Sequence, residues 1–148
     1  IANEKVSGVL NNQMVVRGVA VGDYDKDGDL DLLLTENNGP AHLWRNDTMK
    51  KNYLRVDLIG TDSNKDGIGS KVLLYIEGYK MERLIRTGSS YLSQSELTAT
   101  FGLGDHQKVD SLFIFWPNGN KEVFYDIEIN KEILIKENSG EGEYFIKK

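Results

Sequence analysis

The sequence predicts an all-β protein whose main part is an antiparallel β-sandwich, or a barrel-like variant of it. Short apolar runs recur about every 8–12 residues with turn-forming residues between them, as in sandwiches and barrels. No segment combines apolar residues at helical spacing with helix-capping residues at both ends. With 148 residues, 39% of them hydrophobic, the chain is long enough to bury a core.

Two strands are expected first, on either side of an acidic loop. Residues 15–22 are rich in valine, and residues 30–37 begin with a leucine at every second position. A glycine-proline turn and the short segment 41–47 follow. We therefore expect residues 1–50 to form one small unit and residues 51–148 to form a larger β domain.

The larger domain is expected to contain eight short strands. They are residues 53–60, 70–78, 80–88, 96–104, 110–119, 121–127, 131–138 and 143–148. Glu77-Gly78 is expected to join two of these strands in a tight hairpin. Residues 117–120 combine a proline with an Asn-Gly pair, which predicts a second turn.

One of these strands is apolar on both faces. Leu112, Ile114 and Trp116 share one face because side chains alternate along a strand. Phe113 and Phe115 share the other face. We therefore expect a central strand that is covered above and below.

The loop between the first two strands is the most informative feature of the chain, because it carries an aspartate at every second position. These residues are Asp23, Asp25, Asp27, Asp29 and Asp31. Two carboxylates about 5 Å apart repel by roughly 3 kcal/mol at an effective dielectric constant near 20. A compact loop of this kind therefore needs a cation, and calcium suits it because calcium takes six to eight hard oxygen ligands.

The spacing assigns a role to each residue of the loop. The first three aspartates would turn their carboxylates toward one centre, and Gly28 at the sixth position would permit a sharp turn. Asp29 would offer its backbone carbonyl, and Asp31 would complete the shell with its carboxylate. An EF-hand would need an acid where Leu34 stands and a helix on either side, so a strand-loop-strand calcium site is preferred. A solvated acidic turn without metal is the remaining alternative.

A second loop repeats part of this spacing. Asp62, Asn64 and Asp66 are followed by Gly67, but the ninth position is Ser70 instead of an acid. Two carboxylates and one amide make a poor calcium shell. A structural turn with Asx-type hydrogen bonds is therefore preferred, with a weak second ion site as the alternative.

Composition narrows the classes of partner. The net charge of −5 and the pI near 5.1 argue against a nucleic-acid partner. No apolar stretch is long enough to span a membrane, and zero cysteines exclude disulfides and thiolate chemistry. A calcium loop of modest affinity would be filled where calcium is millimolar, which predicts an extracellular, cell-surface or periplasmic location.

Catalytic motifs are weak. His106 follows an aspartate, so a triad with Ser93 or Ser95 can be imagined, but no spacing supports it. The segment 88–96 holds four serines and Tyr91, which would suit either a polar structural loop or a sugar-docking surface. The structural reading of this segment is preferred.

The first unit resembles an FG-GAP or VCBS repeat, the blade of a calcium-decorated β-propeller. The resemblance covers residues 17–47 and joins the acidic loop to its two flanking strands. It implies calcium binding by a repeat unit of the β-propeller type. Because a propeller typically needs about four or more blades, we expect further repeats upstream in a longer protein.

Residues 52–138 resemble the ASPIC/UnbV domain that follows such repeats in cartilage acidic protein-like proteins and in many bacterial surface or exported proteins. The pieces that carry the resemblance are residues 60–72, 88–96, 101–104 and 116–119. The resemblance implies an extracellular interaction role and no enzymatic activity.

The sequence therefore predicts a calcium-binding extracellular β module with a structural, adhesion or protein-interaction role. Its partners would be the calcium ion and a protein or a glycan outside the cell. Two alternatives stay open: a carbohydrate-binding module of a surface protein, and an accessory domain of an exported enzyme.

Overall fold

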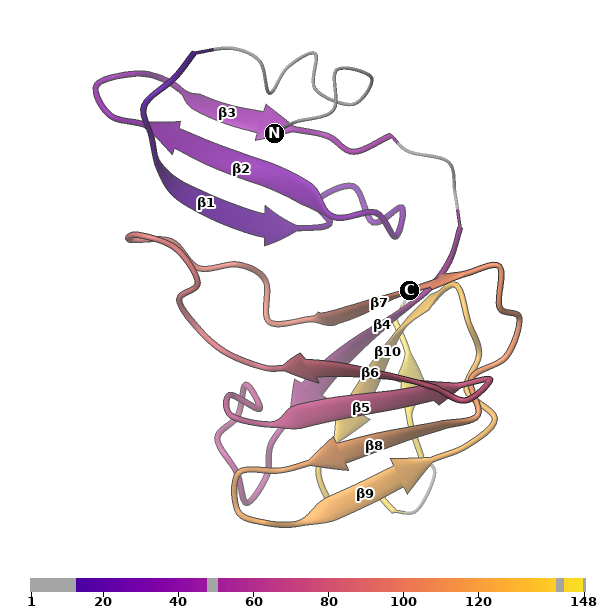
Figure 1. The fold of residues 1–148 in the computed structure, drawn as a ribbon. Helices are drawn as coiled ribbons and strands as arrows, with labels where there is room; N and C mark the ends of the chain where they lie inside the picture. Colours follow the sequence, from indigo (N-terminus) through magenta and orange to yellow (C-terminus); the bar gives the residue numbers. More distant parts are fainter. Residues whose placement is uncertain (1–12, 48–50, 141–142, 148) are drawn as a thin grey trace.

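The computed structural model describes residues 13–47, 51–140 and 143–147, which form three β-sheets and no helix (Figure 1). The strands are β1 (Val16–Gly22), β2 (Asp31–Glu36), β3 (Ala41–Trp44), β4 (Asn52–Ile59), β5 (Lys71–Ile76), β6 (Tyr79–Leu84), β7 (Ala99–Gly104), β8 (Ser111–Phe115), β9 (Lys121–Phe124), β10 (Lys131–Lys136) and β11 (Phe145–Ile146). Both strands predicted around the acidic loop, and all eight predicted after it, are present. Within the described residues, no helix is long and apolar enough to cross a membrane.

The first sheet is a small antiparallel unit in the order β1-β2-β3. Its strands are joined by the acidic loop and by a short turn, so each strand pairs with its neighbour in the sequence. Val21 pairs with Leu32, and Leu33 pairs with Leu43. The acidic loop therefore lies at one end of this sheet, between β1 and β2.

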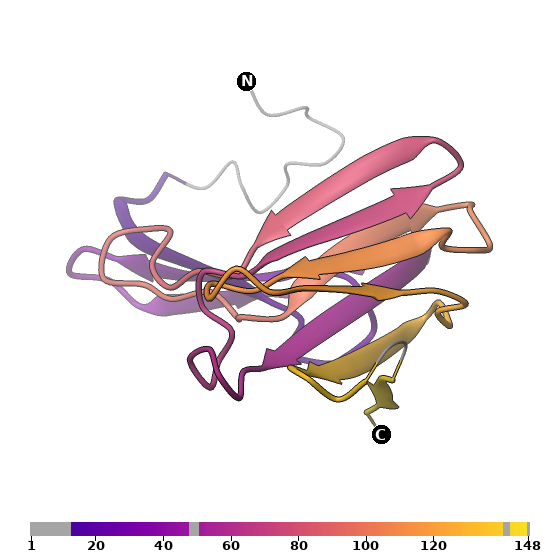
Figure 2. The ribbon, with the colours of Figure 1, turned by 90° about the horizontal axis from the view of Figure 1, so that it is seen from below.

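The remaining strands form a β-sandwich of two four-stranded sheets. Their orders are β11-β10-β4-β7 and β6-β5-β8-β9, and Figure 2 shows them as two layers. One continuous core lies between the sheets. It includes Leu54 and Ile133 from the first layer and Leu74 and Ile114 from the second, all fully buried. The predicted all-β sandwich is confirmed, and neither sheet closes into a barrel.

One strand pair departs from the antiparallel pattern. β10 runs parallel to β4, with Ile133 opposite Val56 and Ile135 opposite Leu58. The two strands are far apart in the sequence, and alternation shows which side chains are buried but not which strand lies beside which. This parallel pair was therefore not predicted.

The two turns predicted in the sandwich have the expected chemistry. Glu77 and Gly78 form a two-residue hairpin with φ values of 46° and 82°, which matches the twist of the strands on either side. In the second turn, Gly119 has a φ of 94° and its amide donates to the Trp116 carbonyl at 3.0 Å. Both turns place a glycine where a side chain would be strained.

β8 occupies an inner position of its sheet, as predicted. Leu112 and Ile114 are fully buried in the core. On the opposite face Phe113 and Phe115 are half-buried, and the Lys121 ammonium lies 4.6 Å and 5.4 Å from their ring centres. Cover on this face therefore comes from side chains of the same sheet.

The serine-rich segment between β6 and β7 covers the open edge of β1. The Val19 and Val21 amides donate to the hydroxyls of Ser90 and Ser95 at 3.2 Å and 3.1 Å. The Glu96 amide donates to the Val21 carbonyl at 3.0 Å. The structural reading of this segment is therefore supported, since its hydroxyls satisfy a strand edge and attach the first sheet to the sandwich.

Candidate metal centre

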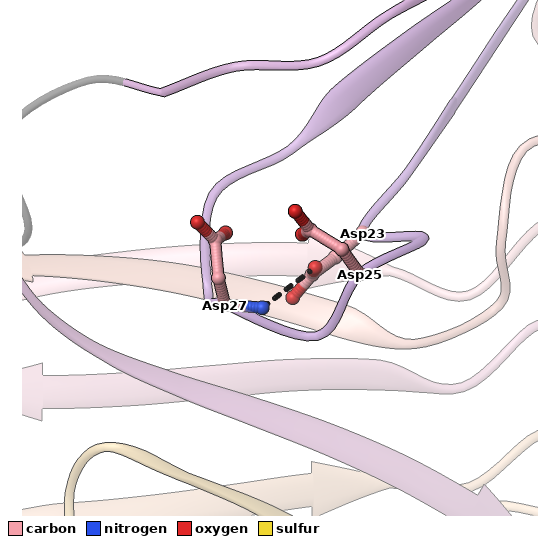
Figure 3. Close-up of side chains that lie close together, drawn as sticks. All are labelled: Asp23, Asp25 and Asp27. Carbon is pink, nitrogen blue, oxygen red and sulfur yellow. Dashed lines mark hydrogen bonds between the residues drawn. The ribbon is translucent and has the colours of Figure 1, made fainter.

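Three of the predicted ligands lie together in the acidic loop. Asp23, Asp25 and Asp27 each bring a carboxylate oxygen within 4.8 Å of the others (Figure 3). Gly28 has a φ of 98°, and a Cβ at this position would lie 2.4 Å from the Tyr53 ring. The predicted sharp turn at the sixth position is therefore confirmed, and only glycine fits it.

Hydrogen bonds within the loop hold this arrangement in place. Asp23 Oδ1 accepts from the Asp27 amide at 3.1 Å, and Asp23 Oδ2 accepts from the Gly28 amide at 2.9 Å. Asp27 Oδ1 accepts from the Asp29 amide at 3.0 Å. The loop thus positions its first and third aspartates through its own backbone, as in an Asx-type turn.

Asp31 has a different place from its three neighbours. It is buried at the start of β2 and does not belong to the group within 4.8 Å. Its two oxygens accept from the Tyr24 amide at 3.0 Å and from the Asn46 amide at 2.8 Å. Asp31 therefore connects the loop with the segment after β3. The carbonyl ligand predicted at Asp29 stays a prediction.

The charged form of Asp25 is disfavoured by its surroundings in the loop. Partial burial raises the pKa of Asp25, and repulsion from Asp27 and Asp31 raises it further. Arg45 opposes this effect, with its Nε 3.9 Å from an Asp25 oxygen. The donors are carboxylate oxygens on a tight loop, so they fit a hard cation such as calcium.

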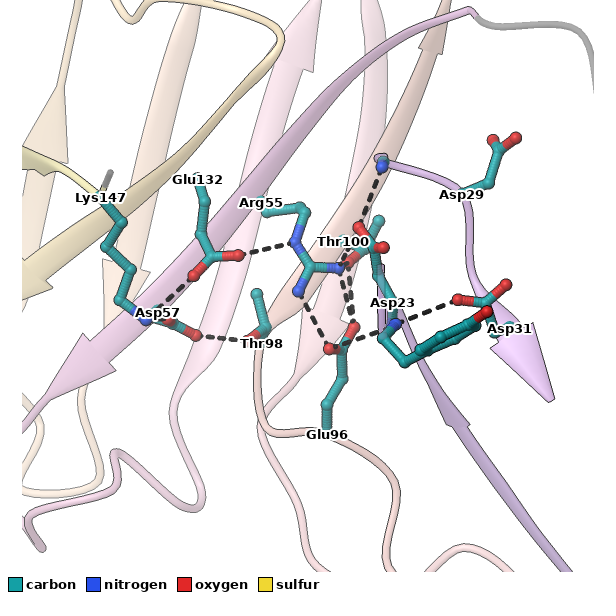
Figure 4. A network of polar contacts seen from close by, with 12 residues as sticks. Asp23, Asp29, Asp31, Arg55, Asp57, Glu96, Thr98, Thr100, Glu132 and Lys147 are labelled. Carbon is teal, nitrogen blue, oxygen red and sulfur yellow. Dashed lines mark hydrogen bonds and ion pairs between the residues drawn. The ribbon is translucent and has the colours of Figure 1, made fainter. Parts of the chain in front are cut away.

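A buried arginine links this loop to the sandwich (Figure 4). The Arg55 side chain, on β4, is 5% exposed. Its guanidinium lies 3.1 Å from Asp23 Oδ2, 3.0 Å from Glu96 Oε2 and 3.0 Å from Glu132 Oε2. It also donates to the Thr100 hydroxyl at 3.3 Å. One cation therefore connects the acidic loop, the segment before β7, and strands β4, β7 and β10.

The network continues toward the end of the chain. Lys147 Nζ lies 3.0 Å from Glu132 Oε1 and also contacts Asp57, which accepts a hydrogen bond from Thr98. Burial raises the pKa of Glu132, but hydrogen bonds from Lys147 and Arg55 outweigh it and leave the pKa lowered. Glu132 is therefore held in its charged form between two cations.

Sequence reasoning missed Arg55 and Glu96. A signal for Arg55 was present, because this charged residue stands between Leu54 and Val56 in a predicted strand. Such a residue needs a partner of opposite charge when it is buried. Its partners could not be read from the sequence, since Glu96 and Glu132 are 41 and 77 positions away.

The second loop is built as a structural turn. Asn64 Oδ1 accepts from the Ile68 amide at 2.8 Å, and its Nδ2 donates to the Ile68 carbonyl at 2.6 Å. The predicted structural turn is present, but the side-chain hydrogen bonds of Asn64 reach four residues along the chain instead of the two of an Asx turn. A weak second ion at Asp62, Asn64 and Asp66 stays the alternative.

The buried carboxylate of Glu137, the residue after β10, holds the start of this loop. Glu137 is 1% exposed, and its Oε2 accepts from the amides of Thr61, Asp62 and Ser63 at 2.8 Å, 3.0 Å and 2.8 Å. Its Oε1 accepts from the Ser63 hydroxyl at 2.9 Å and from Asn118 Nδ2 at 2.7 Å. Glu137 thus occupies the place where a bound anion would satisfy the loop amides.

The catalytic triad considered for His106 with Ser93 or Ser95 is not formed. His106 Nδ1 lies 2.9 Å from Glu77 Oε2. The Ser93 hydroxyl donates to a backbone carbonyl two residues away, and the Ser95 hydroxyl accepts from Val21. These groups therefore take part in separate structural contacts.

Comparison with known proteins finds one matching family and several relatives. The family described as ASPIC and UnbV matches residues 60–142. Cartilage acidic protein 1 of Xenopus tropicalis is 37% identical over 107 residues, which cover 69% of this chain. The mouse and human proteins of the same name are each 36% identical over the same length. The chain spans only 16% of the length of these relatives.

Proposed function

The chain belongs to the ASPIC and UnbV family, and on this basis we propose that it is a calcium-binding extracellular β module without enzymatic activity. Its role is a structural one, or one in adhesion or protein interaction. Relatives named after cartilage support a location outside the cell, where calcium is millimolar. The first unit, residues 17–47, is a repeat of the FG-GAP or VCBS type, with further repeats upstream in the full-length protein.

One observation carries this proposal: Asp23 belongs both to the group of three aspartates and to the Arg55 network. Asp23, Asp25 and Asp27 would hold the ion, with Asp29 and Asp31 as the further predicted ligands. The bound calcium would neutralise the repulsion among the carboxylates. Because Asp23 also contacts Arg55, an ordered loop fastens the first sheet to the sandwich.

Calcium is expected to stabilise the protein measurably. At a free calcium concentration ten times the dissociation constant, mass action adds about 1.4 kcal/mol to the free energy of unfolding. The measurement is urea unfolding in a chelator and in calcium. The double substitution Asp25→Asn and Asp27→Asn should abolish the difference between the two conditions, because it removes two of the three grouped carboxylates.

The matched control is Asp126→Asn, at an exposed aspartate outside the acidic loop whose carboxylate lies 3.6 Å from Lys108 Nζ. This variant should keep the full calcium response. Equal unfolding free energies in chelator and calcium for the wild type, together with no bound metal by elemental analysis, would contradict the proposal.

A further inference from the structure

A cavity of about 500 Å³ lies between the first sheet and the two edge strands β6 and β7 of the sandwich. Its walls come from the end of β6, the segment before β7 and the start of β7, with Val21 and Leu30 on the side of the first sheet. Figure 1 shows the segment between β6 and β7 next to the first sheet. The volume lies within the range of roughly 300–1,000 Å³ found for binding sites.

The wall along β6 is a free strand edge. β6 is the first strand of its sheet and pairs only with β5 among the described strands. The Ile85 amide and carbonyl bond to Ser70 and Gly69, so they point toward β5. Backbone direction alternates along a strand, so the Leu84 amide and carbonyl point away from β5 and toward solvent. An extended peptide can add to such an edge.

Two arginines line the same cavity. The Arg83 Nε donates to the Thr100 carbonyl at 3.1 Å, and its guanidinium lies 5.3 Å from the centre of the Phe101 ring. Its Nη1 donates to the Glu82 carbonyl at 2.9 Å, so among the described residues only Nη2 of its terminal nitrogens makes no hydrogen bond. Within the described part of the chain, Arg86 makes no hydrogen bond or ion pair, and it is exposed. The site therefore presents two positively charged side chains, although the net charge of the protein is −5.

The acids of the cavity wall already have cationic partners. Glu82 lies 3.4 Å from Lys71 Nζ and 3.7 Å from Lys80 Nζ. Glu96 is bound by the buried Arg55. Neither acid contacts the guanidinium of Arg86, so a ligand carboxylate can take that place.

The rest of the lining combines aliphatic side chains with the hydroxyl residues Ser89, Ser95, Thr98 and Thr100. Ile85 and Ala99 are buried, Leu97 is half-buried, and Val21 closes the side toward the first sheet. The Leu84 side chain is 53% exposed at the rim. Burial of aliphatic ligand side chains against this surface would favour binding, because it removes apolar area from water.

We propose that this groove binds an extended peptide segment of alternating aliphatic and acidic residues, which adds to the edge of β6. Its backbone pairs with the outward amide and carbonyl of Leu84. Its aliphatic side chains lie against Ile85 and Leu97, and its carboxylates, on the opposite face of the peptide, lie toward Arg86. The inference rests on the protein-interaction part of the proposed function and not on calcium.

The test uses a fluorescein-labelled hexapeptide that alternates valine and aspartate, with binding followed by fluorescence anisotropy. Saturable binding is expected, and it should weaken as sodium chloride is raised because the charged contacts are screened. Arg86→Glu should weaken binding about tenfold or more, since a charge-assisted contact becomes a repulsive one. Arg17→Glu, at an exposed arginine of β1 outside the cavity, should bind as the wild type does.

Two further peptides separate strand addition from charge attraction alone. A valine-aspartate peptide with N-methylated alternate amides should lose binding, because it cannot pair with a strand edge. A valine-serine peptide should bind at least about tenfold more weakly. The proposal is overturned if the first peptide does not saturate, if the N-methylated or serine peptide binds equally well, or if Arg86→Glu has no effect.

Each titration is repeated in a chelator and in calcium, which separates this proposal from the calcium site. Peptide binding in both conditions supports the groove even if the acidic loop takes no metal. A calcium response in unfolding without peptide binding would overturn the groove and leave the metal proposal standing.

Discussion

Arg55→Ala is expected to lower the free energy of unfolding by about 3–5 kcal/mol, because it leaves buried carboxylates without their cation. Asp23, Glu96 and Glu132 each lie within 3.1 Å of the guanidinium. Lys147 still compensates Glu132, but no other cation contacts Asp23 among the described residues. Urea unfolding of the two proteins in a chelator measures the difference.

The matched control is Arg45→Ala. Arg45 also pairs with aspartates, Asp47 at 2.7 Å and Asp25 at 3.9 Å, but its side chain is 52% exposed. An exposed pair of this kind contributes little to stability, because water and salt screen it. In calcium the cost of Arg55→Ala should be smaller, because the ion compensates part of the charge of Asp23. Equal losses for Arg45→Ala and Arg55→Ala would contradict the role given to the buried network.

Glu137→Ala is expected to destabilise the protein by about 3 kcal/mol or more. The substitution removes the acceptor of three backbone amides, the Ser63 hydroxyl and the Asn118 amide. A buried donor without an acceptor costs about 1–3 kcal/mol, and only part of this loop can turn to water. The exposed Glu128→Ala serves as the control and should change stability by about 0.5 kcal/mol or less.

The effect of Glu137 should also depend on pH in a defined direction. Burial raises its pKa, but the hydrogen bonds from Ser63, Thr61 and Asp62 outweigh burial and lower it below the ordinary glutamate value. A group whose pKa is lowered by folding stabilises the protein fully above its unfolded pKa, and this contribution is lost as pH falls through the folded pKa. The difference between wild type and Glu137→Ala should therefore shrink in acid. A difference that stays constant from neutral to strongly acidic pH would contradict this account.

The strands and turns could be predicted because their signals are local. A short apolar run between turn residues identified β8, and the Glu77-Gly78 pair identified the hairpin between β5 and β6. Both signals depend on neighbours in the sequence. The parallel pairing of β4 with β10 depends on contacts between distant segments, so no local pattern shows it. The same limit hides the match between Glu137 and the amides near Thr61, which are 74 to 76 positions away.

The acidic loop shows the same difference between local contacts, which could be predicted, and contacts with distant segments, which could not. Its spacing predicted that Asp23, Asp25 and Asp27 would converge and that Gly28 would turn the chain, and the structure has both features. It did not predict that Asp31 would hold two backbone amides, because one of them belongs to Asn46 beyond β3. Residues that serve the loop are therefore visible in the sequence, whereas residues that connect it to other segments are not.

The central claim is that calcium binds in the acidic loop, and a crystal structure of the protein grown in calcium tests it most directly. The account predicts anomalous density within the group formed by Asp23, Asp25 and Asp27, with oxygen ligands at about 2.3–2.6 Å. Well-ordered carboxylates with only water between them at millimolar calcium would contradict it.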